Sequence, residues 1–333
     1  MTDKNILLVG GAGYIGNHIF ISLLTEGFSP IIVDNFSNSH KYKIANLEKY
    51  TKKKITFIEA DINNKPDIQN IFDKYNIIAV IHLAALKSVP ESDSNYISYY
   101  QNNISGLINI LDVMNSNNVK KIIFSSSATV YGEKASPPVI ESMPLISNNT
   151  YGFTKIIGEE LIKNICKIDD SWSALILRYF NPAGSADSKL FHEDPKTPGG
   201  NLFPLIAACF KDKNKRNFDI YGNDYNTSDG TPVRDFIHVE DLAYAHVLGV
   251  KKIFHTTNYF NAINVGSGSP KTVLEIVKKF EEITQIKLNI SFKERRSNDI
   301  ESSFANIDLA AKEIGFVPKH NLDSICNSCI DLM

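Results

Sequence analysis

The amino-acid sequence predicts an α/β protein with a doubly wound parallel sheet and a smaller C-terminal α/β domain. Three observations lead to this prediction. Short apolar runs alternate with helix-length segments in the first half of the chain, a glycine-rich segment joins the first run to the first helix, and the pattern changes after Asn181. Strands that alternate with helices predict right-handed βαβ units, which place helices on both faces of a parallel sheet.

The candidate strands are short runs rich in Ile, Val, Leu and Phe, as strands buried on both faces require. They are "NILLVG" (5–10), "PIIVDN" (30–35), "ITFIEADI" (55–62), "AVIHLAA" (79–85), "KIIFSSS" (121–127) and "SALILRYF" (173–180). The segments between them have helical spacing, as with Ile15, Ile19 and Leu23. We expect these runs to be the strands of one sheet.

The second half of the chain mixes its elements. Residues 181–201 are rich in Pro, Gly and Asp and predict a long surface loop. We expect helices at 201–210, 239–253 and 272–284, and short strands with a polar loop over 218–239. The expected domains are residues 1–181, to which 235–264 return, and residues 182–234 with 265–333.

Composition narrows the class of protein. The chain has 333 residues, is 43% hydrophobic and 22% charged, and carries a formal net charge of −2. Spread rather than massed Lys and Arg argue against nucleic acid or a membrane surface as the main partner. With no apolar run of 18 residues and no leader pattern, we expect a cytoplasmic protein.

Cysteine usage points the same way, because four cysteines make no disulfide framework. Cys326 and Cys329 form a CxxC without a second pair, which favours two half-buried thiols over metal or redox use. No metal site is predicted.

The glycine segment "LLVGGAGYIGNHIF" has the context of a dinucleotide-binding loop. Gly10, Gly13 and Gly16 end a strand and open a helix, where a pyrophosphate can approach free N–H groups. Asp34 closes the second run, and a carboxylate there accepts hydrogen bonds from a ribose 2′-OH. The alternative is a tight turn with a solvated Asp. The two features together predict a Rossmann-type domain that binds NAD rather than NADP.

A second group of residues predicts acid–base chemistry. Ser127 closes the fifth run, and Tyr151 and Lys155 lie one helical turn apart in "YGFTK". We expect the ammonium to lower the pKa of the phenol, and a fall of about 3 units corresponds to about 4 kcal/mol. Tyr151 would then take a proton from a sugar hydroxyl while NAD takes the hydride. Alone, the pair could be a surface detail of the helix.

Together these motifs resemble the extended short-chain dehydrogenase/reductase superfamily over nearly the whole chain. The stretches "GGAGYIG", "SSSATVYG", "LRYFNPAG" and "GNDYNTSDGTPVRDFIHVEDLAYAH" resemble the UDP-glucose (UDP-galactose) 4-epimerases more specifically. The resemblance implies NAD that stays bound, oxidation at C4 of the hexose, and return of the hydride to the opposite face.

The resemblance also implies the site residues, with Ser127, Tyr151 and Lys155 as the catalytic group. The implied cofactor contacts are Gly10, Gly13, Tyr14, Ile15, Gly16, Asp34, Asn35, Phe36, Ser37, Asn38, Ser39, Asp61, Ile62, Leu83, Ala84, Ala85, Lys87, Asn102, Ser125, Tyr151, Lys155 and Phe180. The implied substrate contacts are Lys87, Ser127, Tyr151, Tyr179, Asn181, Asn201, Leu202, Tyr221, Arg234, Arg296, Asp299 and Ser303. Either Arg, taken alone, could form a structural ion pair, and we expect His82 and His238 to be structural.

Three positions depart from the family pattern. Val9 stands where threonine is frequent and Ala85 where glycine is common. Ser303 stands where a tyrosine would restrict the enzyme to UDP-glucose and UDP-galactose, so its small side chain predicts that UDP-GlcNAc and UDP-GalNAc are also accepted. A register slip to Ser302 keeps this conclusion, whereas a slip to Phe304 reverses it.

Other readings stay open at this point. They are a related epimerase that prefers UDP-GlcNAc or a uronic acid, a net NAD-dependent dehydrogenase, and a non-catalytic NAD-binding scaffold. Lys87 is the only candidate cation for a uronic acid. The family further implies a homodimer, with helices around 98–114 and 150–165 as candidate contacts.

Overall fold

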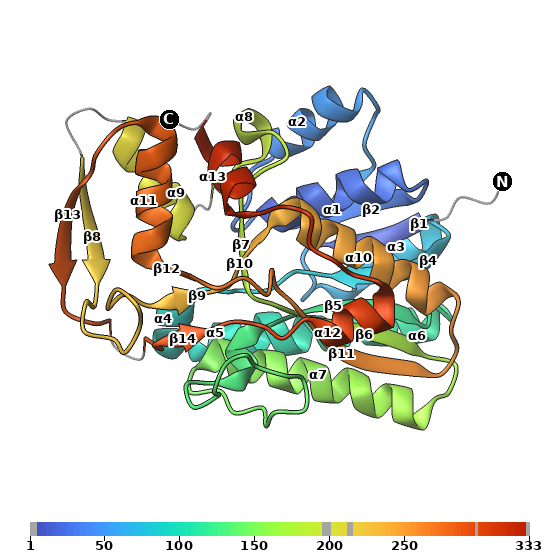
Figure 1. Ribbon diagram of the computed structural model, residues 1–333. Helices are drawn as coiled ribbons and strands as arrows, with labels where there is room; N and C mark the ends of the chain where they lie inside the picture. Colours follow the sequence, from blue (N-terminus) through green and yellow to red (C-terminus); the bar gives the residue numbers. More distant parts are fainter. Residues whose placement is uncertain (1–4, 195–200, 212–215, 297–298, 331–333) are drawn as a thin grey trace.

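A seven-stranded parallel sheet forms the centre of the protein (Figure 1). The computed structural model describes residues 5–194, 201–211, 216–296 and 299–330. The strand order is β11-β6-β5-β4-β1-β2-β3, and all pairings in it are parallel. The strands are β1 (Asn5–Val9), β2 (Ser29–Asp34), β3 (Phe57–Glu59), β4 (Ile77–His82), β5 (Lys121–Ser127), β6 (Ser173–Tyr179) and β11 (Tyr259–Val265). The predicted fold class is therefore confirmed.

Helices cover both faces of this sheet, and each face has its own apolar core. One core includes side chains of α1 (Tyr14–Thr25), α2 (Tyr42–Thr51), α10 (Val239–Phe254) and α12 (Asp308–Ile314). The other includes side chains of α3 (Lys65–Lys74), α6 (Gly106–Ser116) and α7 (Thr150–Ile168). The helical segments α4 (Val89–Ser94), α5 (Tyr96–Tyr100) and η1 (Gln101–Ser105) lead into α6, and η2 (Ala128–Tyr131) follows β5.

Six of the seven strands follow the predicted runs, whereas β11 lies in a segment for which no strand was predicted, and one run forms a shorter strand than expected. The run 55–62 forms a strand only at Phe57–Glu59. This strand is the sheet edge, and Phe57 is 42% exposed. An edge strand has one neighbour to bond with, so its pairing stops where the β2 partner ends.

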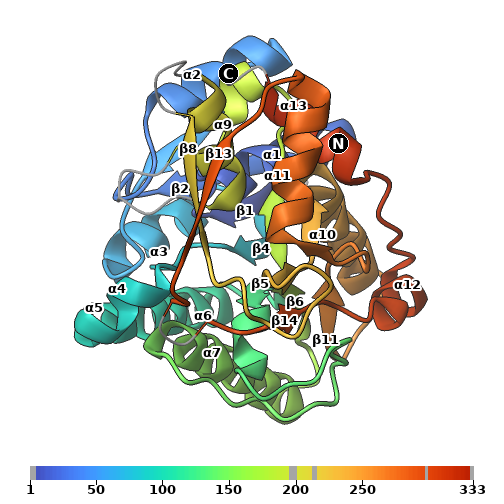
Figure 2. The same ribbon diagram turned by 60° about the vertical axis from the view of Figure 1, so that its left-hand side comes forward.

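The C-terminal part builds three small sheets beside the large one (Figures 1 and 2). They pair β7 (Asn181–Ala183) with β10 (Phe236–His238), β8 (Asn217–Tyr221) with β13 (Asn289–Lys293), and β9 (Val233–Arg234) with β12 (Lys271–Thr272) and β14 (Ser302–Ser303). A third core gathers α9 (Leu202–Lys211), α11 (Val273–Thr284) and α13 (Leu322–Ile330) against these strands.

The segment 181–201 differs from the loop that its composition predicts. Within its described part lie β7 and a short helix, α8 (Ser188–Phe191). β7 exists because Asn181–Ala183 pair with β10, more than 50 residues later in the chain, and local composition carries no trace of that partner. The chain then returns to the large sheet, where β11 pairs with β6 and α10 packs on α1.

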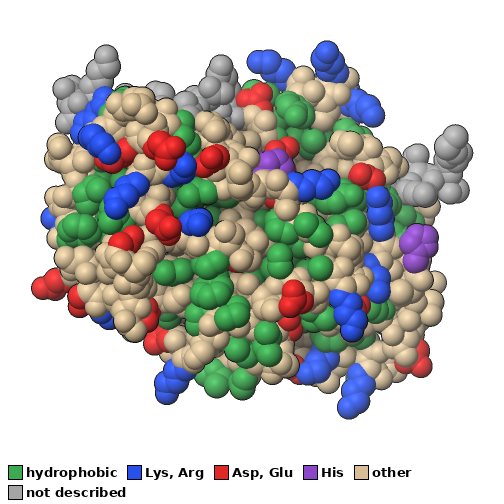
Figure 3. Space-filling view, viewed as in Figure 1, with side chains coloured by type: hydrophobic (Ala, Val, Ile, Leu, Met, Phe, Trp, Pro, Cys, Tyr) green, Lys and Arg blue, Asp and Glu red, His purple; other side chains and the backbone are tan. Residues whose placement is uncertain are grey.

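The surface carries both signs of charge side by side, as the face in Figure 3 illustrates. Among the residues that the structure describes, no helix is both long and apolar enough to span a membrane.

Candidate active site

The glycine loop packs too closely for side chains at two of its three positions. Gly10 has φ +81°, and a Cβ built there would lie 2.7 Å from the backbone N of Ala84. A Cβ on Gly16 would lie 2.6 Å from the backbone O of Gly11. Gly13 is the N-cap of α1 and brings no side chain to the helix start. The loop thus leaves a bare, backbone-lined cradle at a helix N-terminus, which fits a dinucleotide pyrophosphate.

Asp34 lies against this loop at the end of β2. Its Oδ2 accepts from the N of Ala12 at 3.0 Å, and its Oδ1 accepts from the N of Phe36 at 2.8 Å. The hydroxyl of Ser39 donates to Oδ1 at 3.0 Å. The carboxylate is therefore fixed beside the cradle, where an NAD ribose would need its acceptor.

The other predicted cofactor residues cluster near the carboxyl edge of the sheet. Asn35 donates to Asp61 at 2.8 Å, and Ile62 packs under Gly106, where an added Cβ would lie 2.4 Å from it. After β4, the amides of Leu83 and Ala84 bond to the carbonyl of Val9 at 2.8 and 3.0 Å. Tyr14 and Ile15 begin α1, the segment after β2 carries Phe36, Ser37 and Asn38, and the segment after β4 carries Ala85 and Lys87. Asn102 lies in η1, Ser125 in β5, and Phe180 directly after β6.

One residue of this region escaped the sequence reasoning. The buried amide of Asn103 bonds to both the N and the O of Leu86, at 2.8 and 3.0 Å, and donates to Thr154 at 3.0 Å. It clamps the loop after β4 to α7. Only its neighbour Asn102 was predicted, and nothing in the sequence pattern separates the two asparagines.

Ser127, Tyr151 and Lys155 meet behind this loop. Asn149 caps α7 by accepting from the N of Gly152 at 2.8 Å, and so fixes the first turn that carries Tyr151. The Tyr151 hydroxyl lies near Ser127, whose Oγ bonds to Thr129 Oγ1 at 2.7 Å. The Lys155 Nζ donates to the carbonyl O of Ser125 at 2.8 Å and lies 5.8 Å from the centroid of the Tyr151 ring.

The electrostatics of this group differ from the expectation. Burial raises the pKa of Tyr151 to about 12, although the nearby Ser127 hydroxyl opposes the rise. Burial lowers the pKa of Lys155 to about 8, and the Glu159 carboxylate opposes that fall. The expected lowering of the Tyr151 pKa is therefore wrong for the chain by itself. The ammonium is held by a backbone carbonyl instead of the phenol, and desolvation dominates.

Tyr179, predicted to contact substrate, has its hydroxyl in the interior. It bonds to Ser125 Oγ at 2.5 Å and to Nε2 of His246 on α10. Burial lowers the pKa of His246 to about 4, so this imidazole is neutral. Tyr179 thus joins the site to the layer of α10, and the next residues along the chain, Phe180 and Asn181, leave the sheet toward the C-terminal part.

The predicted nucleotide clamp comes together in two groups. Arg234 Nη2 pairs with Asp299 Oδ1 at 2.5 Å, and Ser303 lies beside Arg234 in the pairing of β14 with β9. The guanidinium carbon of Arg296 lies 4.4 Å from the centroid of the Tyr221 ring. The sequence analysis left open whether either Arg forms an ion pair, and Arg234 does form one. Its carboxylate partner, Asp299, is itself a predicted substrate contact.

A carboxylate links two further predicted ligands. Lys87 Nζ lies 3.0 Å from Oε1 of Glu193, and the amide of Asn201 donates to the two Glu193 oxygens at 2.9 and 2.8 Å. Leu202 packs against the third core. Glu193 was not predicted, and its position in a Pro- and Gly-rich segment offered no periodic signal.

Comparisons with known proteins agree with this geometry. Residues 6–266 match the model of the NAD dependent epimerase/dehydratase family. The chain belongs to this family. It is 42% identical to a UDP-glucose 4-epimerase of Dictyostelium discoideum over 324 residues, which are 97% of this chain and 94% of that protein.

Solved structures of the family are also similar. The UDP-glucose 4-epimerase from Bifidobacterium longum in complex with NAD+ and UDP has a TM-score of 0.93 and 38% identity, covering 99% of this chain and 98% of that one. The UDP-Glc/GlcNAc 4-epimerase from Campylobacter jejuni has a TM-score of 0.85 and 30% identity, covering 99% and 98%.

The two departures near the cofactor sites of this epimerase-family chain are structurally mild. Val9 is fully buried in the core at the end of β1, and Ala85 lies half-buried in the loop after β4. Cys326 and Cys329 are buried in the third core, more deeply than expected, and burial raises the pKa of Cys329 to about 11. Such thiols are poor nucleophiles and poor metal ligands.

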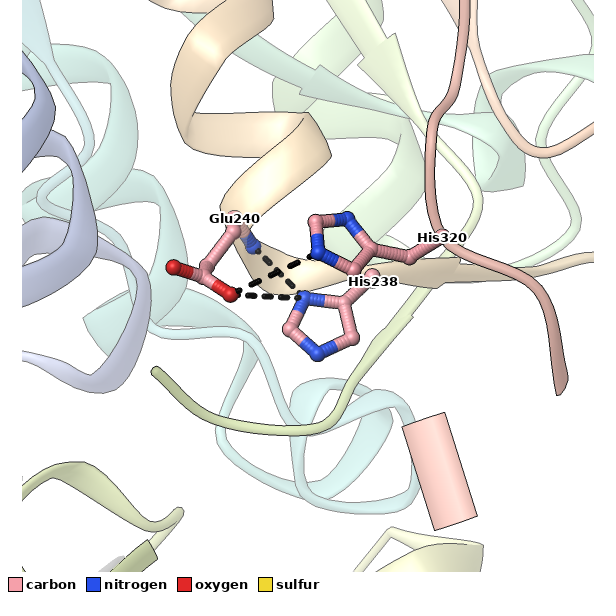
Figure 4. Close-up of side chains that lie close together, drawn as sticks. All are labelled: His238, Glu240 and His320. Atoms are coloured by element: carbon pink, nitrogen blue, oxygen red, sulfur yellow. Dashed lines mark hydrogen bonds and ion pairs between the residues drawn. The ribbon is translucent and has the colours of Figure 1, made fainter. Parts of the chain in front are cut away.

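His238, expected to be structural, caps α10 by accepting from the N of Glu240 at 3.2 Å. Its ring stacks on that of His320 with 4.2 Å between centroids, and both lie 3.7 Å from a Glu240 oxygen (Figure 4). The Nδ1 lone pair of His238 already accepts a hydrogen bond, and two stacked rings cannot both direct a lone pair at one ion. We therefore read the group as the cap of α10. His82 is likewise buried, stacked on Phe124.

Proposed function

We propose that the protein is a UDP-glucose 4-epimerase that interconverts UDP-glucose and UDP-galactose with tightly bound NAD. One observation carries the proposal: Ser127, Tyr151 and Lys155 meet at the sheet edge that also holds the glycine cradle. The names of the relatives support the same activity. Retention of both Tyr151 and Lys155 disfavours a non-catalytic scaffold.

The residues present fit NAD. The cradle of Gly10, Gly13 and Gly16 would hold the pyrophosphate, Asp34 the adenosine ribose, and Asp61 with Ile62 the adenine. NAD, when bound, supplies a hydride acceptor and donor at C4 of the sugar and a positive charge near Tyr151.

Tyr151 is the acid and base of the reaction. The phenolate takes the proton of the 4-hydroxyl during oxidation and gives it back during reduction, while Ser127 hydrogen-bonds the reacting oxygen. With a pKa near 12 in the chain alone, Tyr151 needs positive charge beside it to act at neutral pH. Lys155 supplies part of that charge from the next turn of α7.

The UDP part of the substrate must stay bound while the hexose rotates to present its other face. Arg234 and Arg296 would bind the pyrophosphate with forked donors, and the Tyr221 ring offers a face to uracil. Asn181, Asn201, Leu202 and Asp299 would complete the clamp. We assign NAD binding to residues 1–181 with 235–264, and UDP-sugar binding to residues 182–234 and 265–333. If UDP is bound tightly and the hexose loosely, the hydride can be transferred to either face of C4.

Ser303 supports a wider substrate range. It lies in register with Arg234, so it borders the clamp, and its side chain is small. We propose that UDP-GlcNAc and UDP-GalNAc are also interconverted, as the name of the Campylobacter jejuni relative states for that enzyme with GlcNAc. Lack of turnover of UDP-GlcNAc at saturating concentration would refute this extension.

A homodimer is the second part of the proposal. Apolar side chains on α5, α6 and α7 are exposed: Tyr96 at 51%, Ile97 at 54%, Ile108 at 47% and Phe153 at 46%. The helices that carry them lie in or beside the candidate contacts 98–114 and 150–165. Light scattering on wild type and on Phe153→Glu tests this, since the variant should be a monomer and an unchanged mass would contradict the assignment.

The central test is a coupled assay with UDP-galactose on wild type and on Tyr151→Phe. We expect the variant to lose roughly 10²–10⁴-fold in kcat because its proton carrier is gone. UDP binding, measured by calorimetry, should remain. Steady release of NADH would favour a dehydrogenase instead, and full activity of the variant would overturn the mechanism.

A further inference from the structure

A buried ion pair lies directly behind the candidate catalytic residues. Arg178 on β6 donates to Glu159 on α7 through Nη2 at 2.7 Å and through Nε at 3.1 and 3.2 Å. Both side chains are almost fully enclosed, with 6% and 4% of their surface exposed. Fully enclosed charges are costly to desolvate, and apolar pairs of similar volume stabilise a fold equally well or better. A role beyond stability therefore has to be considered for this pair.

The pair belongs to a chain of hydrogen bonds. Ser126 donates to Glu159, and Arg178 Nη1 donates to the Tyr131 hydroxyl at 3.0 Å. The Tyr131 hydroxyl in turn donates to Asn264 at 2.5 Å. This series of hydrogen bonds thereby connects β5, η2, α7, β6 and β11 through side chains alone.

Several residues of this hydrogen-bond series lie next to the candidate active site. Ser126 stands between Ser125, whose carbonyl accepts from Lys155, and Ser127, which lies near Tyr151. Glu159 lies one helical turn after Lys155 on α7, and Arg178 precedes Tyr179. Fixing Ser126 and Glu159 together therefore fixes the strand end and the helix turn that hold the three catalytic side chains.

Glu159 is the nearby carboxylate that can stabilise the charge of Lys155. Besides Glu159, two titratable groups of the described residues interact with Lys155: Tyr151 on the same helix and His82 on β4. The other contacts are the Ser125 carbonyl and the Phe124 ring on β5, whose centroid lies 4.9 Å from Nζ. His82 is neutral because burial lowers its pKa to about 3. Across the site, Tyr179 on β6 is held protonated by burial, which raises its pKa.

We propose that Glu159 is a positioning residue that stabilises the ammonium form of Lys155, and that the hydrogen bonds from Arg178 and Ser126 hold the Glu159 carboxylate in place for this purpose. The link to turnover rests on the proposed function, because it is Tyr151 that needs the charged lysine. The charge assignment itself concerns the chain alone.

The test measures the titration of Lys155 directly. Lysines labelled with carbon-13 at Cε are followed by NMR across pH, and the Lys155 signal is assigned by its absence in Lys155→Met. In Glu159→Gln the Lys155 midpoint should fall by roughly one pH unit, since a carboxylate about one helical turn away is lost. The alkaline limb of kcat for UDP-galactose should move down with it, with KM unchanged.

Glu281→Gln is the matched control. Glu281 is a buried, paired carboxylate on α11 that accepts from Lys287 at 2.7 Å and from the N of Leu288 at 2.8 Å. Its loss should destabilise the fold without moving the Lys155 midpoint.

A double variant separates charge from folding. Glu159→Gln leaves Arg178 unpaired and can fail to fold. Glu159→Gln/Arg178→Gln removes both charges, and its Lys155 midpoint should lie between those of wild type and the single variant. An unchanged midpoint in whichever of these variants folds would overturn the proposal. Wild-type turnover of UDP-galactose tests the proposed function separately, because the titration needs no substrate.

Discussion

Replacing Gly10 by alanine tests the cofactor cradle. Gly10 and Gly27 have nearly the same left-handed backbone, with φ +81° and +80°. A Cβ at Gly10 would lie 2.7 Å from the N and 2.8 Å from the Cα of Ala84. A Cβ at Gly27, at the end of α1, meets no atom of the described residues within 4 Å beyond its chain neighbours. Gly27→Ala is therefore the matched control for backbone strain.

The expected magnitudes follow from this difference. Left-handed backbone costs about 1–2 kcal/mol for alanine at either position. Crowding of packed backbone adds about 1–3 kcal/mol at Gly10 alone. At roughly 2 °C per kcal/mol for a chain of this size, Gly10→Ala should melt about 2–6 °C below Gly27→Ala.

The assay is thermal unfolding of both variants, together with the NAD content of the purified proteins. Because the Gly10 clash pushes on the loop after β4, Gly10→Ala should also retain less NAD than Gly27→Ala. Equal melting temperatures and equal NAD content in the two variants would refute the packing argument.

Three further predictions concern Lys155, Ser303 and the buried histidines. Lys155→Met should be inactive in the UDP-galactose assay yet more stable to urea at pH 7 by about 1–3 kcal/mol. The reason is linkage: burial lowers the Lys155 pKa to about 8, so the folded state binds fewer protons than the unfolded state between about pH 8 and 10.4. Wild-type stability should therefore rise with pH across that window, and a flat profile there would contradict the burial argument. Ser303→Tyr should lower kcat/KM for UDP-GlcNAc roughly 10-fold or more and leave UDP-galactose within about threefold, whereas equal losses on both substrates would argue against a specificity role. The free energy of unfolding should fall steeply as pH drops below about 6.5. In that range the histidines of the unfolded state bind protons, whereas the buried histidines of the folded state stay neutral. Burial lowers the pKa of four histidines to about 3 or 4: His18, His82, His238 and His246. Circular dichroism at constant ionic strength should detect acid unfolding well above pH 3, and a fold intact at pH 3 would show that these rings accept protons in place.

Much of this protein can be predicted from local sequence. Apolar runs predict six of the seven strands of the large sheet, because strands buried on both faces need apolar side chains throughout. β11 was not predicted, since it lies at the sheet edge and its first four residues are only half-buried. Gly10 and Gly16 are predictable because the cradle leaves no space for a Cβ, and Tyr151 and Lys155 because helical spacing places them one turn apart.

Features that depend on pairing between distant segments were not predictable. β7 forms only because β10 lies beside it, and Ser303 borders the clamp only because β14 pairs with β9. Asn103 and Glu193 act through partners that the chain reaches by folding, so no spacing in the sequence marks them.

The proton chemistry shows the same division. The sequence by itself determined which groups are the candidates for the chemistry, since a phenol, an amine and a hydroxyl follow from motif and position. Only the tertiary structure decided their charge states, because desolvation depends on everything packed around a group. Burial sets the pKa of Tyr151 near 12 and that of Lys155 near 8, and the buried carboxylate of Glu159, tied to Arg178, opposes the fall at Lys155.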